Sequence, residues 1–192
     1  MSRIQVVYAS RHGATAGIAD RIAEVLQREG HEVMVADAAR RPDPDGFEGY
    51  VVGSGVYMGS WLKDGIEFLD RHLETLAVRP VWLFSSGPLP GSSKETDTAD
   101  PLELALGPTQ GIGSGGHRRI AALAASIGVR DHKVFLGAYD PSDPPKGLPE
   151  RIVRLMPSAS KILPVGDFRD WDAIEAWARE IASALTSEGP VG

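Results

Sequence analysis

The sequence predicts a doubly wound α/β domain, in which a parallel sheet carries helices on both faces. Short apolar runs rich in β-branched residues alternate with longer segments whose apolar residues recur at helical spacing. The runs are almost unbroken, as is typical of strands buried on both sides. With 192 residues, of which 42% are hydrophobic, the chain is long enough to bury one substantial core.

The first half of the chain contains three predicted strands and two predicted helices. Residues 4–9 form the first apolar run, and residues 14–29 carry a helical stripe that a glycine ends. A second strand is expected over residues 31–37 and a third over 50–56. Leucines and isoleucines at helical spacing predict a helix over residues 61–76.

Two further strands and a closing helix follow. Strands are expected over residues 81–85 and 133–138, and Asp170 is the expected N-cap of the last helix. The buried stripe of that helix is expected to consist of Trp171, Ile174, Trp177, Ala178, Ile181 and Leu185. Strands that alternate with helices in this way join by right-handed crossovers into one parallel sheet.

Two segments interrupt this regular alternation. Residues 87–117 are rich in Gly, Pro and Ser and are interpreted as a long loop insertion, which in a compact domain is usually functional. Residues 139–169 form a second irregular stretch, with a short helix expected around 148–156. We expect one domain over residues 1–186 and a frayed tail over 187–192.

The composition restricts the class of function. A net charge of −6 argues against nucleic-acid binding, which needs a basic face. The chain has no cysteine, so disulfides, thiolate metal sites and a cysteine nucleophile are excluded, and no metal site is expected. No secretory segment or membrane-spanning run is recognised, so a cytoplasmic protein is expected, with peripheral membrane contact left open.

Ligands of open parallel sheets bind beyond the carboxyl ends of the strands. The segments that follow the first, third and fourth predicted strands are all small or hydroxyl-bearing, and they should converge at one edge. The expected cofactor-binding residues are Ser10, Arg11, His12, Gly13, Ala14 and Thr15 in the first loop, Ser54, Gly55, Val56, Tyr57, Met58 and Gly59 in the second, and Ser85, Ser86 and Gly87 in the third.

The first loop has the chemistry of a phosphate site. Gly13 permits a tight turn before a helix whose first N–H groups are unpaired, and Ser10 and Thr15 can donate from their hydroxyls. The alternative is a plain strand-to-helix turn in which a hydroxyl caps the helix. The loop is neither a dinucleotide fingerprint nor a nucleoside-triphosphate loop, and the third strand ends without the Asp of a phosphate receiver. A lone phosphate monoester such as that of FMN fits best.

The second loop could face a flat ring. Its glycines allow close approach of the backbone, and Tyr57 and Trp61 could stack on the ring. Trp61 could equally begin the following helix and pack in the core, so Tyr57 is the favoured neighbour of the ring.

These motifs resemble the flavodoxin family and, within it, the menaquinone-dependent protoporphyrinogen oxidase type. The resemblance rests on "YASRHGATAGIA", where Arg11 matches the oxidase branch, on "VVGSGVYMGSW", and on the closing segment "GDFRDWDAIEAWA". It implies a flavodoxin-like fold with a five-stranded parallel sheet of order 2-1-3-4-5. It also implies FMN bound non-covalently, with the phosphate in the first loop and the ring between the second and third.

The resemblance implies an FMN-dependent oxidoreductase that passes electrons from a porphyrinogen-like substrate to a quinone. FMN supplies the redox chemistry, so no side chain is needed as nucleophile, and no catalytic residue is assigned. Two alternatives stay open: a flavodoxin-type electron carrier with redox protein partners, and an interaction module that has lost FMN. The modest net charge is the weak point of the carrier hypothesis, because carriers commonly use a strongly acidic face.

Overall fold

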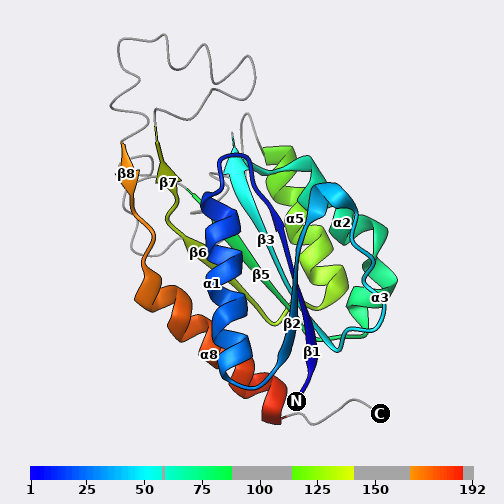
Figure 1. Ribbon diagram of the computed structural model, residues 1–192. Coiled ribbons are helices and arrows are strands. Elements are labelled where there is room, and N and C mark those ends of the chain that lie inside the picture. Colours follow the sequence, from blue (N-terminus) through cyan, green and yellow to red (C-terminus); the bar gives the residue numbers. More distant parts are fainter. Residues whose placement is uncertain (58, 88–113, 141–164, 188–192) are drawn as a thin grey trace, which may run out of the picture.

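The computed structural model describes residues 1–57, 59–87, 114–140 and 165–187, and it shows a parallel sheet between two layers of helices (Figure 1). The strands of the parallel sheet are β1 (Arg3–Ala9), β2 (Glu32–Asp37), β3 (Gly49–Tyr57), β5 (Val81–Ser86) and β6 (Asp131–Phe135). Their order is β2-β1-β3-β5-β6, and the short β4 (Ser60–Trp61) pairs antiparallel with the end of β3. This order confirms the predicted 2-1-3-4-5 topology. When only the five parallel strands are counted, β5 is the fourth and β6 is the fifth.

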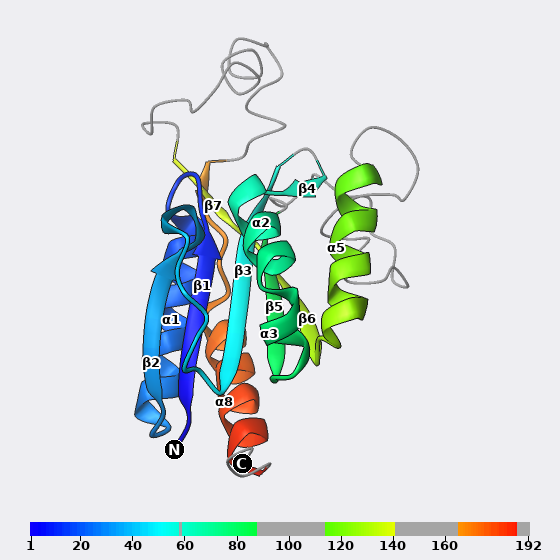
Figure 2. The same ribbon diagram turned by 90° about the vertical axis from the view of Figure 1, so that its right-hand side faces the viewer.

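The helices divide between the two faces of the sheet (Figure 2). One face carries α1 (Ala14–Arg28) and α8 (Trp171–Ser187), which pack against each other. The other face carries α2 (Lys63–Arg71), α3 (Leu73–Ala77) and α5 (Ser114–Ile127), and the 3-10 turn η1 (Ala38–Arg40) contacts α2.

The core is split by the sheet into two clusters. Val6 belongs to the cluster under α1 and α8, whereas its neighbour Val7 belongs to the cluster under the other helices. Successive side chains of a strand point to opposite faces, so a strand covered on both sides must be apolar at every position. This accounts for the unbroken apolar run of the first strand.

The predicted helix over residues 61–76 is wrong in its start and its continuity. Trp61 pairs with Val56 as a strand residue, so the helix begins only at Lys63. At His72 the backbone leaves the helical region, with φ −110° and ψ 21°, while its ring packs 5.0 Å from that of Phe68. Two short helices therefore replace the single expected one.

The predicted strand over residues 133–138 is also divided. Phe135 ends β6 by accepting a hydrogen bond from Gly87 N at 3.0 Å, and the chain then leaves the sheet. Residues Ala138–Tyr139 form β7, which pairs antiparallel with β8 (Gly166–Asp167) in a separate ribbon beside the amino end of α1. The stretch 139–169, which the sequence predicts to be irregular, therefore contains strand residues near both of its ends.

Of the last two helices, α5 is not predicted and α8 is. The expected loop 87–117 overlaps the first four residues of α5. Asp170 caps α8 as predicted, since its Oδ1 accepts from Ala173 N at 3.0 Å. Ser187 is helical rather than part of a frayed tail, and the expected helix at 148–156 lies outside the described residues.

Candidate functional site

Three parallel strands pair with one another close to their carboxyl ends, at the edge of the sheet where the candidate site lies. Ala9 of β1 pairs with Ser54 of β3, which in turn pairs with Ser85 of β5. Because these strands are parallel, the segments that follow them leave the sheet side by side. The structure therefore brings together the three loops that the sequence singles out.

The first loop is shaped by its own backbone and by one hydroxyl. Gly13 has φ +87°, a left-handed conformation that favours glycine, and its N–H donates to Ser10 Oγ at 3.0 Å. The N-cap residue of α1 is Gly13, which has no side chain to cap the helix. The first N–H groups of α1 thus point to the loop without a capping hydroxyl, which is the arrangement that suits an anion rather than a plain capped turn.

Thr15 and Tyr57 meet at Gly55. Thr15 is 3% exposed, and a Cβ built on Gly55 would lie 3.2 Å from Thr15 Oγ1 and 3.1 Å from Tyr57 Cε2. Both distances are shorter than ordinary van der Waals contact. Glycine at position 55 therefore allows the Thr15 hydroxyl and the Tyr57 ring to lie against the end of β3.

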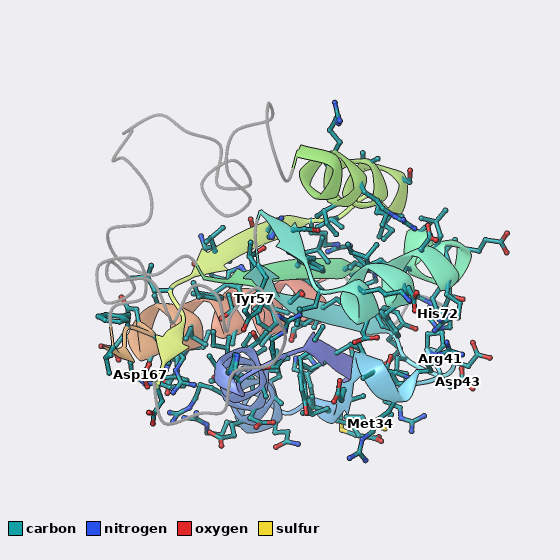
Figure 3. The ribbon with its side chains drawn as sticks, turned by 90° about the horizontal axis from the view of Figure 1, so that it is seen from above. Met34, Arg41, Asp43, Tyr57, His72 and Asp167 are labelled. Carbon is teal, nitrogen blue, oxygen red and sulfur yellow. The ribbon has the colours of Figure 1, made fainter. Side chains whose placement is uncertain are left out.

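Arg11 and His12 fold over the same tyrosine. The Arg11 guanidinium carbon is 4.7 Å from the centroid of the Tyr57 ring, and the His12 ring centroid is 6.4 Å from it. The guanidinium lies in cation–π contact with the ring. Tyr57 is half-buried at the edge of the sheet near α1 (Figure 3), so the cation of the first loop and the aromatic side chain of the second form one unit.

Ser54 and Ser85 are engaged inside the protein. Ser85 is fully buried: its Oγ accepts from Trp61 Nε1 at 2.8 Å and lies 2.9 Å from His132 Nε2. Ser54 Oγ accepts from Leu62 N at 3.0 Å. These hydroxyls hold β4 and α2 against the sheet. Trp61, at 3% exposure, packs in the core as its second interpretation expected, but it does so from β4 and not as the first residue of the helix.

The remaining residues of the predicted site lie around these contacts. Ser86 is buried at the end of β5, and Gly87 N donates to Phe135 O. A Cβ on Gly87 would lie 3.7 Å from Val56 O, so the second and third loops adjoin. Gly59 turns the chain between β3 and β4 with φ +72°, and Met58 lies outside the described residues.

The fold brings a second set of residues, from the last third of the chain, close to the first loop, and the sequence does not predict their position there. The ribbon of β7 and β8 and the segment before α8 face the loop across a cavity of about 570 Å³. It is lined by His12, Gly13, Ala14, Ala138, Asp140, Val165, Gly166, Asp167 and Arg169. Hydrogen bonds from Arg169 hold the pKa of Asp167 below its ordinary value of 3.8. Because 155 residues separate Ala14 from Arg169, no spacing in the sequence signals this contact.

Among the residues that the structure describes, no helix is long and apolar enough to cross a membrane. A cytoplasmic location stays a prediction.

Solved structures that are similar to this chain include two flavodoxins and a rubredoxin oxygen:oxidoreductase. Oxidised flavodoxin 1 from Bacillus cereus is 16% identical, with a TM-score of 0.57, covering 96% of this chain and 99% of that chain. Fusobacterium nucleatum flavodoxin bound to flavin mononucleotide is 17% identical, with a TM-score of 0.50 and the same coverage. Rubredoxin oxygen:oxidoreductase from Desulfovibrio gigas is 14% identical, with a TM-score of 0.59, covering 97% of this chain but 37% of that chain.

The structural likeness, at TM-scores of 0.57 and 0.59 for two of these structures, shows a flavodoxin-like fold. The family model described as "Flavodoxin domain" matches residues 5–110, more than half of the chain. The chain therefore belongs to the flavodoxin domain family. A comparison with curated proteins finds no match.

Proposed function

We propose that this chain binds FMN, with the phosphate on the loop of residues 10–15 and the isoalloxazine between the loops that follow β3 and β5. The observation that carries the proposal is the junction of Thr15, Gly55 and Tyr57, where a hydroxyl beside the phosphate loop meets an aromatic ring. Membership of the flavodoxin domain family supports the same cofactor.

The residues of the first loop fit a phosphate monoester. A Cβ on Gly13 would meet no atom within 4 Å, so the backbone of the loop is open to an incoming group. The donors of the loop are main-chain amides, the Ser10 and Thr15 hydroxyls and the Arg11 guanidinium, and groups of these kinds suit phosphate oxygens. Ser54 and Ser85 are assigned a supporting role, because their hydroxyls already bind within the fold.

We further propose that the chain is an oxidoreductase built as one domain over residues 1–186, with a porphyrinogen-like or quinone substrate. Bound FMN would supply the electron transfer, and the protein would supply position and electrostatic environment. Arg11 beside Tyr57 supports the oxidase branch, because its cation lies next to the proposed position of the ring. The proposed identities of the reductant and the electron acceptor rest on the resemblance of the motifs to the oxidase type.

The flavodoxin-type electron carrier is the second candidate. It is favoured by the B. cereus flavodoxin, whose whole length aligns with nearly all of this chain. A carrier would pass electrons to a protein partner and would not need a small-molecule substrate.

The first experiment is an absorbance spectrum of the protein as purified, followed by titration of apo protein with FMN. A flavin spectrum, or saturable FMN binding, is the expected result. A colourless protein that does not take up FMN would contradict both redox functions and favour the interaction module.

A second experiment separates enzyme from carrier. The reduced flavoprotein is mixed either with a menaquinone analogue or with a cytochrome, and reoxidation is followed by flavin absorbance. Rapid reoxidation by the quinone supports the enzyme. Reoxidation by the cytochrome alone supports the carrier.

A further inference from the structure

The cavity between the first loop and the β7–β8 ribbon contains a rigidly held cation. Arg169 donates from Nε to Asp167 Oδ1 at 2.8 Å and from Nη2 to Asp167 Oδ2 at 2.6 Å. Its guanidinium carbon also lies 4.4 Å from the Trp171 ring centroid, and its side chain is 18% exposed. A carboxylate fork and an aromatic face thus fix the plane of the guanidinium.

The third nitrogen of that guanidinium, Nη1, is held only weakly. It lies 3.4 Å from Ala14 O, a long contact compared with the usual distance of about 2.9 Å for an N–H···O bond. Nη1 therefore retains donor capacity on the side of the cavity where the first loop lies.

Gly17 makes room for this nitrogen against the first turn of α1. A Cβ built on Gly17 would lie 2.6 Å from Nη1, closer than real Cβ contacts. The amino end of a helix carries partial positive charge, so a cation there is disfavoured unless anions compensate it. Asp167 supplies one negative charge, and an anion on the first loop would supply another.

We propose that Arg169 is a phosphate ligand: Nη1 donates to the phosphate of the ligand that binds on the loop of residues 10–15. This inference rests on the proposed function for the identity of that ligand. The phosphate would lie on the α1 side of the cavity, away from the Asp140 carboxylate at the end of β7, which would repel it.

The competing explanation is purely structural, with Arg169 only joining the segment before α8 to the first turn of α1. The two explanations differ in what happens when the phosphate is absent from the ligand. A phosphate ligand changes the affinity for FMN but not for riboflavin, whereas a structural residue changes both or neither.

The test measures dissociation constants of FMN and riboflavin by flavin fluorescence for the wild-type chain, Arg169→Gln and Gly17→Ala. Both variants are expected to lose about tenfold or more in FMN affinity and to keep their riboflavin affinity. Arg21→Gln is the matched control, because Arg21 also lies over Trp171, at 5.2 Å, but does not line the cavity. It should leave both constants unchanged.

Gly17→Ala guards against loss of folding as an explanation. Alanine is favoured over glycine inside a helix, which offsets part of the cost of displacing the Arg169 guanidinium, so the apo variant should stay folded in chemical denaturation while its FMN affinity falls. Equal losses for FMN and riboflavin, or an unchanged FMN affinity in both variants, would overturn the assignment of Arg169.

Calorimetric titration with inorganic phosphate separates this inference from the proposed function. Phosphate binding that disappears in Arg169→Gln, in a chain that binds neither flavin, would support Arg169 as a phosphate ligand and contradict the flavin assignment. If neither phosphate nor FMN binds to the wild-type chain, both proposals fail.

Discussion

Ser10 and Ser85 occupy similar places at the carboxyl ends of β1 and β5, but their hydroxyls have different surroundings. Ser85 is fully buried, binds Trp61 and lies against His132. Ser10 is half-buried, and among the described residues its hydroxyl accepts only from Gly13 of its own loop. A hydroxyl that accepts one bond can still donate its proton to a ligand. The two serines look equivalent in the sequence, but Ser85 is assigned to the fold and Ser10 to the candidate ligand site.

Ser85→Ala should have the largest effect, and that effect should be on stability. The substitution removes the acceptor of the Trp61 indole N–H inside the protein, where an unmatched donor costs about 1–3 kcal/mol. Chemical denaturation of the apo protein measures the loss. Ser86→Ala, one residue further along β5, leaves the bond from Trp61 in place and is the control. A fully stable Ser85→Ala variant would contradict the structural role.

Thr15→Ala should act mainly on the affinity for FMN. If the Thr15 hydroxyl donates to the phosphate, its loss weakens FMN binding by about 1–3 kcal/mol, the cost of an unmatched group at a charged acceptor. Thr15→Ser keeps the hydroxyl and should retain most of the affinity. Unchanged FMN affinity in Thr15→Ala would count against a phosphate on this loop.

Ser10→Ala should have a smaller effect, of about 0.5–1.5 kcal/mol on FMN affinity. The variant loses the bond from Gly13 N that shapes the loop, together with one donor to the phosphate. Its effect on the stability of the apo protein should be smaller than that of Ser85→Ala. A larger loss of stability in Ser10→Ala than in Ser85→Ala would contradict the roles assigned to the two serines.

The smallest effect concerns acid stability at Asp167. Hydrogen bonds from Arg169 lower the pKa of Asp167 from 3.8, so this carboxylate stabilises the folded state above that pH. The contribution is lost as the pH falls through the lowered folded-state pKa. Unfolding midpoints measured at decreasing pH should show a weaker acid dependence in Asp167→Asn than in the wild-type chain. The exposed Asp20, changed to Asn, is the control, and equal curves for both variants would contradict the pairing.

The fold and the convergence of the loops follow from local patterns. Apolar runs indicate buried strands, and parallel strands that alternate with helices must end at one edge. The signal for α5 was also present, since Ile120, Leu123 and Ile127 are buried at helical spacing, but a Gly- and Ser-rich stretch precedes them.

The partners of individual side chains could not be predicted in this way. Trp61 and Ser85 are 24 residues apart, and whether a serine binds a tryptophan or a ligand depends on packing across the sheet. Arg169 reaches Ala14 from the far end of the chain, through a ribbon that two-residue strands form. Such short strands leave no periodicity to detect.

The proposed function depends above all on the loop of residues 10–15 holding the phosphate of FMN. The most direct test compares the dissociation constants of FMN and riboflavin for the apo wild-type chain, because the two ligands differ only in the phosphate. FMN should bind about tenfold or more tightly than riboflavin, as expected for charge-assisted hydrogen bonds to the phosphate. Equal affinities, or no binding of either flavin, would contradict the claim.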